Sequence, residues 1–157
     1  MTPKLSVLVV DDYVDGREMV AEYLAFRGLS VAQAKGGDEA IELAKTLKPD
    51  VILMDLRMPG TDGWEATRQL KANPITSHIL IVALTAHAMS AEKESAWKAG
   101  CDAVVAKPYD LAALSQAVLR VPKVGAAAFD IAGLSQNPSR AATNRNRPRR
   151  RLKKRES

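Results

Sequence analysis

The amino-acid sequence predicts an α/β fold, a doubly wound five-stranded parallel sheet with strand order 2-1-3-4-5 and helices on both faces. Short apolar runs alternate with amphipathic stretches five times within the first 120 residues. Parallel strands need crossover connections, so this strict alternation indicates a parallel sheet. A closed eightfold barrel would also alternate strands and helices, but it needs a chain longer than these 157 residues.

The first half of the chain supplies two strand–helix units. Residues 5–10 are almost continuously apolar and rich in valine, which predicts a buried central strand. A helix over 15–27 that Gly28 ends is predicted by apolar residues at helical spacing, which are Met19, Val20, Tyr23, Leu24 and Phe26. Residues 29–34 follow as a weaker strand, and Asp38 is then expected to cap a second helix.

The second half of the chain repeats the pattern three times. Apolar runs predict strands, and each is followed by a stretch of helical period. The strands are expected at 51–54, 79–84 and 102–106, and the helices at 63–72, at 90–99 and onward from Asp110. Right-handed crossovers and the chain length favour the flavodoxin-like (βα)5 order 2-1-3-4-5.

Charge and composition divide the chain into two parts. Residues 138–157 contain nine Lys or Arg and one Glu, a net charge of +8, so the other 137 residues carry −3 of the total +5. We expect one domain over residues 1–121 and a disordered, basic tail over 122–157. Basic blocks bind nucleic acid or other acidic surfaces without reading sequence, and a simple solvated tail is the alternative.

The composition also bears on the cellular compartment. No apolar run approaches the roughly 18 residues of a membrane span, and the N-terminal residues lack the features of a signal peptide. A single cysteine, Cys101, cannot form an internal disulfide. These features predict a cytoplasmic protein without a transmembrane segment.

Polar residues follow four of the five predicted strands at the point where each strand ends. They are Asp11 and Asp12 after the first strand, Asp55 after the third, Thr85 after the fourth and Lys107 after the fifth. In open parallel sheets the functional crevice lies at the carboxyl ends of the strands, where the strand order reverses. We therefore expect the three carboxylates to converge, with Thr85 and Lys107 approaching from the other side.

These residue types indicate phosphoryl chemistry. Three adjacent carboxylates shift one another's pKa values unless a cation neutralises them, and oxygen ligands with open positions suit Mg²⁺. A lysine offers a point charge to phosphate, and a threonine hydroxyl can donate to a phosphoryl oxygen. An aspartate that faces both a metal and a lysine is suited to act as a nucleophile that forms an acyl phosphate.

Four stretches, "VVDDY", "VILMDLRMPGTDG", "IVALTAHAM" and "VVAKPYD", resemble the receiver domain of two-component response regulators. The resemblance covers residues 5 to about 120 and extends to the order, the spacing and the strand-end context of the motifs. It implies that Asp55 is the phosphoacceptor, Thr85 the switch hydroxyl and Lys107 the phosphate-binding lysine, followed by Pro108 in a peptide bond that is typically cis. The implied Mg²⁺ ligands are Asp12 directly, Asp11 through water, Asp55, and the backbone carbonyl of Arg57.

One position departs from the family pattern. The family usually places a Tyr or Phe three residues before the lysine, where the ring changes rotamer on activation, and this chain has Val104. Tyr109 lies on the other side of the Lys-Pro pair and is no substitute. The phosphorylation chemistry does not involve Val104, but the aromatic readout of the family does. The Arg57 side chain is expected beside the phosphoryl site, where it could tune hydrolysis.

We therefore predict a single-domain response regulator. A sensor histidine kinase or a phosphotransfer protein would phosphorylate Asp55, and a partner protein would respond at the face formed by the fourth helix, fifth strand and fifth helix. The protein would be no enzyme in the turnover sense, with slow autodephosphorylation only. The alternatives are a constitutive scaffold with a receiver fold, a tail-mediated nucleic-acid binder, and a phosphohydrolase, which would need an Asp where Arg57 stands.

Overall fold

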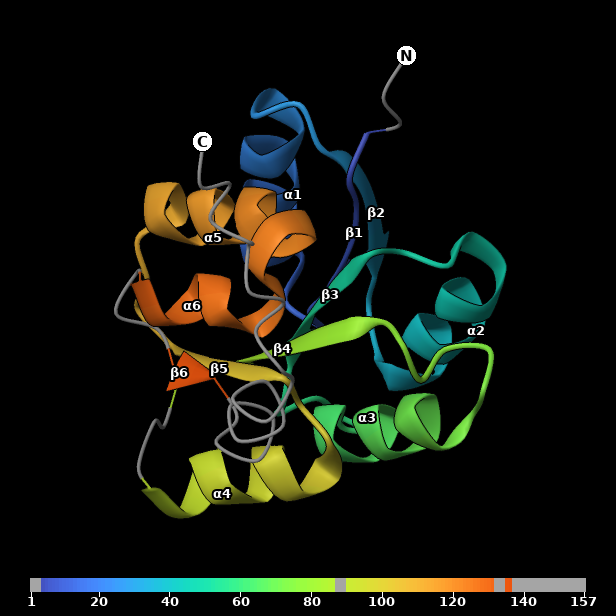
Figure 1. Ribbon diagram of the computed structural model, residues 1–157. Coiled ribbons are helices and arrows are strands. Elements are labelled where there is room, and N and C mark those ends of the chain that lie inside the picture. The colour runs from blue at the N-terminus through green and yellow to red at the C-terminus, as the bar shows by residue number, and fades with distance from the viewer. Residues whose placement is uncertain (1–3, 87–89, 132–134, 137–157) are drawn as a thin grey trace, which may run out of the picture.

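The computed structural model describes residues 4–86, 90–131 and 135–136, and its core is a parallel sheet (Figure 1). Five parallel strands follow the order β2-β1-β3-β4-β5, which confirms the predicted order. The strands are β1 (Ser6–Val10), β2 (Ser30–Ala34), β3 (Val51–Asp55), β4 (Leu80–Thr85) and β5 (Ala103–Ala106).

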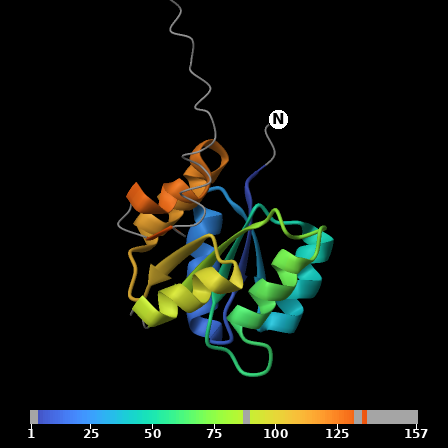
Figure 2. The same cartoon turned by 60° about the horizontal axis from the view of Figure 1, so that its bottom comes forward.

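Helices cover both faces of the sheet, as predicted. They are α1 (Val14–Phe26), α2 (Gly37–Leu47), α3 (Gly63–Ala72), α4 (Ser90–Ala99) and α5 (Leu111–Val124). Helices α1 and α5 pack on one face, and α2, α3 and α4 pack on the other (Figures 1 and 2). Within the part of the chain that the structure describes, no helix combines the length and the apolar character that crossing a membrane requires.

The central strand β3 is buried on both faces of the sheet, which explains its uninterrupted apolar sequence. Val51 and Leu53 belong to the core under α1 and α5, whereas Ile52 and Met54 belong to the core under α2, α3 and α4. All four side chains are fully buried. Burial of each contributes on the order of 1.5–3 kcal/mol, so the strand is fixed on both faces and its carboxyl end is held rigidly.

The start of α2 differs from the prediction that Asp38 caps it. The N-cap residue is Gly36, and Asp38 lies in the first turn, where its carboxylate accepts a hydrogen bond from Thr61 Oγ1 at 2.6 Å. The backbone at Gly37 packs so close to the backbone at Thr61 that a Cβ on Gly37 would clash with the Thr61 carbonyl, and this contact sets where the helix begins. Long-range packing therefore sets this helix start, and local capping chemistry does not.

The packed structure also continues beyond the expected domain boundary at residue 121. Helix α5 includes Pro122 and ends at Val124, and a 3₁₀ turn (Gly125–Ala127), α6 (Ala128–Ile131) and β6 (Ser135–Gln136) follow. Phe129 is fully buried with the α1 and α5 core, and β6 pairs antiparallel with β5. The apolar stretch was too short to show a period in the sequence. The prediction of disorder for residues 137–157 lies outside the described residues.

Candidate functional site

The parallel register brings the predicted site residues to one edge of the sheet. In β1 and β3, Val10 pairs with Met54, so the residues that follow, Asp11 and Asp55, come to the same level. Thr85, the last residue of β4, pairs with Ala106 at the end of β5, and Lys107 follows directly. The Lys107 amide donates to the Thr85 carbonyl at 2.7 Å, which ties these two strand ends together.

Three carboxylates meet at this edge. Ligand oxygens of Asp11, Asp12 and Asp55 all lie within 4.8 Å of one another. Asp11 and Asp55 are 9% and 8% exposed, whereas Asp12 is exposed to solvent. The Asp11 carboxylate accepts a hydrogen bond from the Tyr13 amide at 2.9 Å, and the Asp55 carboxylate accepts one from the Arg57 amide at 3.3 Å. The backbone thus orients two of the three acidic groups.

Lys107 lies against the same carboxylates. Its Nζ is 3.8 Å from Asp55 Oδ1 and 3.9 Å from Asp11 Oδ2, at the outer limit of an ion pair. The Lys107–Pro108 peptide bond is cis, in line with the family resemblance. One ammonium group therefore faces two buried carboxylates and leaves a net negative charge at the site.

The pKa of Asp55 reflects this excess of negative charge. Burial raises the pKa of the Asp55 carboxyl from 3.8 to about 6, with the Asp11 carboxylate contributing to the rise and Lys107 opposing it. A divalent cation would relieve both the desolvation and the repulsion. Clustered carboxylate oxygens with one exposed member form a donor set that fits Mg²⁺, which keeps part of its water shell.

Thr85 and Arg57 are both bound by Glu92, an acidic residue outside the predicted site. Thr85 Oγ1 donates a hydrogen bond to Glu92 Oε2 at 2.9 Å. The Arg57 guanidinium forms an ion pair with the other oxygen of Glu92 and lies 5.8 Å from the ring centroid of Trp64. Glu92 belongs to the first turn of α4 and follows no motif, so only its helix position could have drawn notice.

Val104 and Tyr109 occupy the two positions around the lysine where an aromatic side chain matters in the family. Val104 is 1% exposed and packs in the core under α2, α3 and α4. Tyr109 is partly buried against the opposite core. Burial, with the negative charges of Asp11 and Asp55, raises the pKa of the Tyr109 phenol to about 12. Because Tyr109 packs against a different core from Val104, it does not replace the aromatic ring that Val104 lacks.

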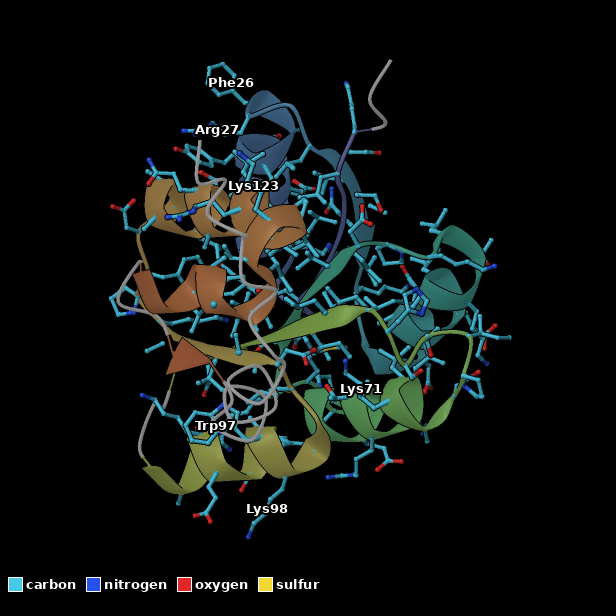
Figure 3. The ribbon with its side chains drawn as sticks, in the orientation of Figure 1. Phe26, Arg27, Lys71, Trp97, Lys98 and Lys123 are labelled. Carbon is cyan, nitrogen blue, oxygen red and sulfur yellow. The ribbon has the colours of Figure 1, made fainter. Side chains whose placement is uncertain are left out.

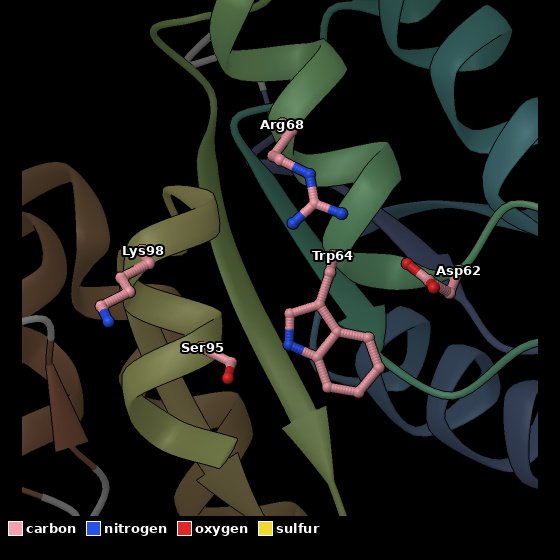
Figure 4. A pocket seen from close by; sticks show the side chains of 5 residues that line it. All are labelled: Asp62, Trp64, Arg68, Ser95 and Lys98. Carbon is pink, nitrogen blue, oxygen red and sulfur yellow. The ribbon is translucent and has the colours of Figure 1, made fainter. Parts of the chain in front are cut away.

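A separate surface pocket of about 390 Å³ lies between α3 and α4 (Figure 4). It contains none of the predicted site residues, and its lining consists of Asp62, Trp64, Arg68, Ser95 and Lys98. Asp62 is the N-cap of α3 and accepts a hydrogen bond from the Glu65 amide at 2.9 Å. Asp62 thus has a structural role, and the chemistry-bearing residues gather at the strand ends instead.

Known proteins with similar sequences are response regulators. The model of the response regulator receiver domain family matches residues 7–119. The polar-differentiation response regulator DivK of Brucella anthropi is 34% identical over 103 residues, which are 66% of this chain and 84% of DivK. DivK of Brucella ovis matches over the same number of residues with the same identity.

Similar solved structures agree with the sequence comparison. The chemotaxis protein CheY4 of Vibrio cholerae has a TM-score of 0.72 and 28% identity, with 76% of this chain and 99% of that chain covered. The receiver domain of the sensor histidine kinase PA1611 from Pseudomonas aeruginosa has a TM-score of 0.70 and 31% identity, with coverages of 75% and 97%. That structure holds a magnesium ion coordinated in its active site cleft.

Proposed function

Because the chain belongs to the response regulator receiver domain family, we propose that Asp55 accepts a phosphoryl group from a sensor histidine kinase or a phosphotransfer protein. One observation carries the proposal. The Asp55 carboxylate stands at the end of a rigid buried strand, within 4.8 Å of two other aspartate carboxylates and 3.8 Å from the Lys107 ammonium. This is the environment that an aspartate nucleophile for phosphoryl transfer requires.

Each side chain of the site has its own role in the phosphoryl transfer. An ionised Asp55 oxygen attacks phosphorus as the bond from phosphorus to the donor histidine nitrogen breaks, and that nitrogen takes up a proton. Lys107 offsets the charge of the transferred group, and the Thr85 hydroxyl donates to one of its oxygens. Asp11, Asp12, Asp55 and the Arg57 carbonyl would hold Mg²⁺. The ion supplies charge neutralisation to the phosphoryl oxygens.

The output of the switch is a changed preference for a partner protein. Phosphorylation converts the ionised Asp55 carboxylate into an acyl phosphate with a charge of about −2, which draws Thr85 and Lys107 toward it. We place the partner on the face of α4, β5 and α5, where β6 already pairs with β5. The proposal includes a cytoplasmic location and no enzymatic turnover, with slow loss of the phosphoryl group to water only.

Intact-mass measurement tests the phosphoacceptor role. After incubation with acetyl phosphate and Mg²⁺, the wild-type protein should gain the mass of one phosphoryl group, and Asp55→Asn should gain none. Omission of Mg²⁺ should remove the gain. A wild-type protein that keeps its mass under these conditions would falsify the proposal.

Val104 supports a second candidate, a constitutive scaffold with a receiver fold. Without the aromatic ring of the family, the domain could be phosphorylated and yet leave its partner face unchanged. Binding of a captured partner to the unphosphorylated and the phosphorylated protein separates the two functions. Equal affinity in both states favours the scaffold.

The basic tail supports a third candidate, a contact with nucleic acid or another acidic surface. Residues 138–157 carry a net charge of +8. Binding of this kind weakens steeply with salt because it depends on counterion release. Removal of residues 138–157 should abolish DNA retention and its salt dependence, and unchanged retention would discard this contact.

A further inference from the structure

Both oxygens of the Glu92 carboxylate are bound by residues of the candidate site. Oε2 accepts the hydrogen bond from Thr85 Oγ1 at 2.9 Å, and Oε1 pairs with the Arg57 guanidinium. The Glu92 side chain is only 17% exposed and Thr85 is buried, so the Thr85–Glu92 hydrogen bond is largely shielded from water, whereas the Arg57 side chain is mostly exposed. A single side chain of α4 therefore connects the end of β4 with the loop that follows the acceptor strand.

The bridge to Thr85 excludes the contact that phosphoryl transfer needs. A threonine hydroxyl carries one proton, so it can donate to Glu92 or to a phosphoryl oxygen, but not to both. Arg57 meets a similar choice between two anions, although its several donors make that choice less strict. A phosphoryl group on Asp55 would also add negative charge near the Glu92 carboxylate.

We propose that Glu92 is a positioning residue that competes with the phosphoryl group for the Thr85 hydroxyl. In the unphosphorylated protein, Glu92 holds Thr85 and Arg57 through the first turn of α4. When Asp55 is phosphorylated, Thr85 donates to the phosphoryl oxygen and the first turn of α4 is released. This inference rests on the proposed phosphoacceptor function of Asp55.

Release of Glu92 gives the domain a route to its partner face that needs no aromatic residue on β5. Val104 is buried in the core and has no ring to reorient. The Thr85–Glu92 hydrogen bond instead connects the acceptor site directly to α4, one of the three elements of the proposed partner face. The structure thus contains a link from the acceptor site to α4 that does not involve Val104.

Two measurements on Glu92→Ala test the competition. The variant should take up the phosphoryl group from acetyl phosphate about fivefold faster or more, since one hydrogen bond no longer has to be broken. Amide hydrogen exchange in α4 should be as fast in the unphosphorylated variant as in the phosphorylated wild type. A role of Glu92 in α4 stability alone would change the exchange and leave the phosphorylation rate unaltered.

Two further variants complete the design. Glu92→Gln keeps the size of the side chain and an acceptor for Thr85 but removes the ion pair, so its phosphorylation rate should fall between wild type and Glu92→Ala. Glu94→Ala is the matched control, because Glu94 lies on the same helix and pairs at 3.8 Å with an exposed Lys98 of that helix. It should behave as the wild type in both measurements.

The outcomes separate this inference from the proposed function. If the wild type gains no phosphoryl mass, both fail together, and the mass spectrum alone reveals it. If the wild type is phosphorylated but both Glu92 variants show wild-type rates and wild-type exchange in α4, the competition is overturned while the phosphoacceptor role stands.

Discussion

At the residue scale, Asp55 combines a reactive position with an unfavourable environment for its charge. Burial and the Asp11 carboxylate raise its pKa to about 6, above the value of 3.8 in the unfolded chain. The folded protein therefore binds a proton at Asp55 more tightly than the unfolded chain does. The contribution of Asp55 to stability is fully present below pH 3.8 and is lost as the pH rises through about 6.

Asp55→Asn should consequently stabilise the metal-free protein at neutral pH. The shift from 3.8 to about 6 corresponds to a difference of about 2–3 kcal/mol in the free energy of unfolding at pH 7. Urea unfolding of both proteins in the presence of a chelator should show this gap shrinking as the pH is lowered from 7 to 4. Saturating Mg²⁺ should narrow it at pH 7. If the difference in the free energy of unfolding between the two proteins does not depend on pH, burial does not destabilise the Asp55 charge.

Arg57 should influence the phosphorylated state without influencing metal binding. Its implied metal contact is the backbone carbonyl, which Arg57→Ala retains, and its guanidinium is engaged by Glu92 and Trp64. Since the side chain is 62% exposed, its charge is worth little more than an ordinary surface ion pair, and the lifetime of the phosphorylated state should change by about twofold to fivefold. Decay of a phosphorylated sample and Mg²⁺ titration measure the two effects separately. Unchanged decay would discard the role.

At the element scale, the sequence predicted the order of strands and helices because each element carries its own apolar period. It is harder to predict from the sequence which side chains of a helix are buried. Met19 and Phe26 helped to predict α1, yet they are 57% and 86% exposed, and Phe26 points outward (Figure 3). Of the other apolar residues that predicted the helix, Val20 and Leu24 are buried together with Ala21, because the position of α1 against the sheet decides which face is covered.

Close packing at the start of α2 gives a sharp stability prediction. A Cβ on Gly37 would clash with the Thr61 carbonyl, so Gly37→Ala should lower the free energy of unfolding by about 1–3 kcal/mol. The neighbouring Gly36 has no atom within 4 Å of its Cβ position and an extended φ of −171°, and serine is a good N-cap residue. Gly36→Ser should therefore be neutral or slightly stabilising. Equal effects of the two substitutions in thermal unfolding would exclude the packing account.

Some residues of the candidate site could likewise be predicted from the sequence, and others could not. Asp11, Asp12, Asp55, Thr85 and Lys107 were accessible from the sequence because each stands at a strand end, and parallel pairing brings strand ends together. Glu92 was not accessible in this way. It approaches the site from a helix, and its contact with Thr85 depends on how α4 packs, which no local pattern in the sequence specifies.

At the scale of the whole molecule, the described residues that directly follow α5, residues 125–131, pack against the domain. Phe129 contributes a large, fully buried side chain to the core that α1 and α5 cover. Composition concealed this contribution, because a single aromatic residue among alanines gives no period and lies close to a strongly basic stretch. Average composition therefore does not reveal that this segment packs against the core.

Two truncations should locate the boundary between the domain and the tail. A chain that ends at Gln136 keeps α6, β6 and Phe129, whereas a chain that ends at Val124 loses all three. The shorter chain, like Phe129→Ala, should lose about 3–5 kcal/mol in the free energy of unfolding, the usual effect of deleting a buried aromatic side chain. The chain that ends at Gln136 should unfold at the urea concentration of the full chain, since the sequence of the residues removed is mostly charged and polar. If both truncations destabilise equally, the basic residues contribute to the fold, and if neither does, the buried position of Phe129 contributes nothing to stability.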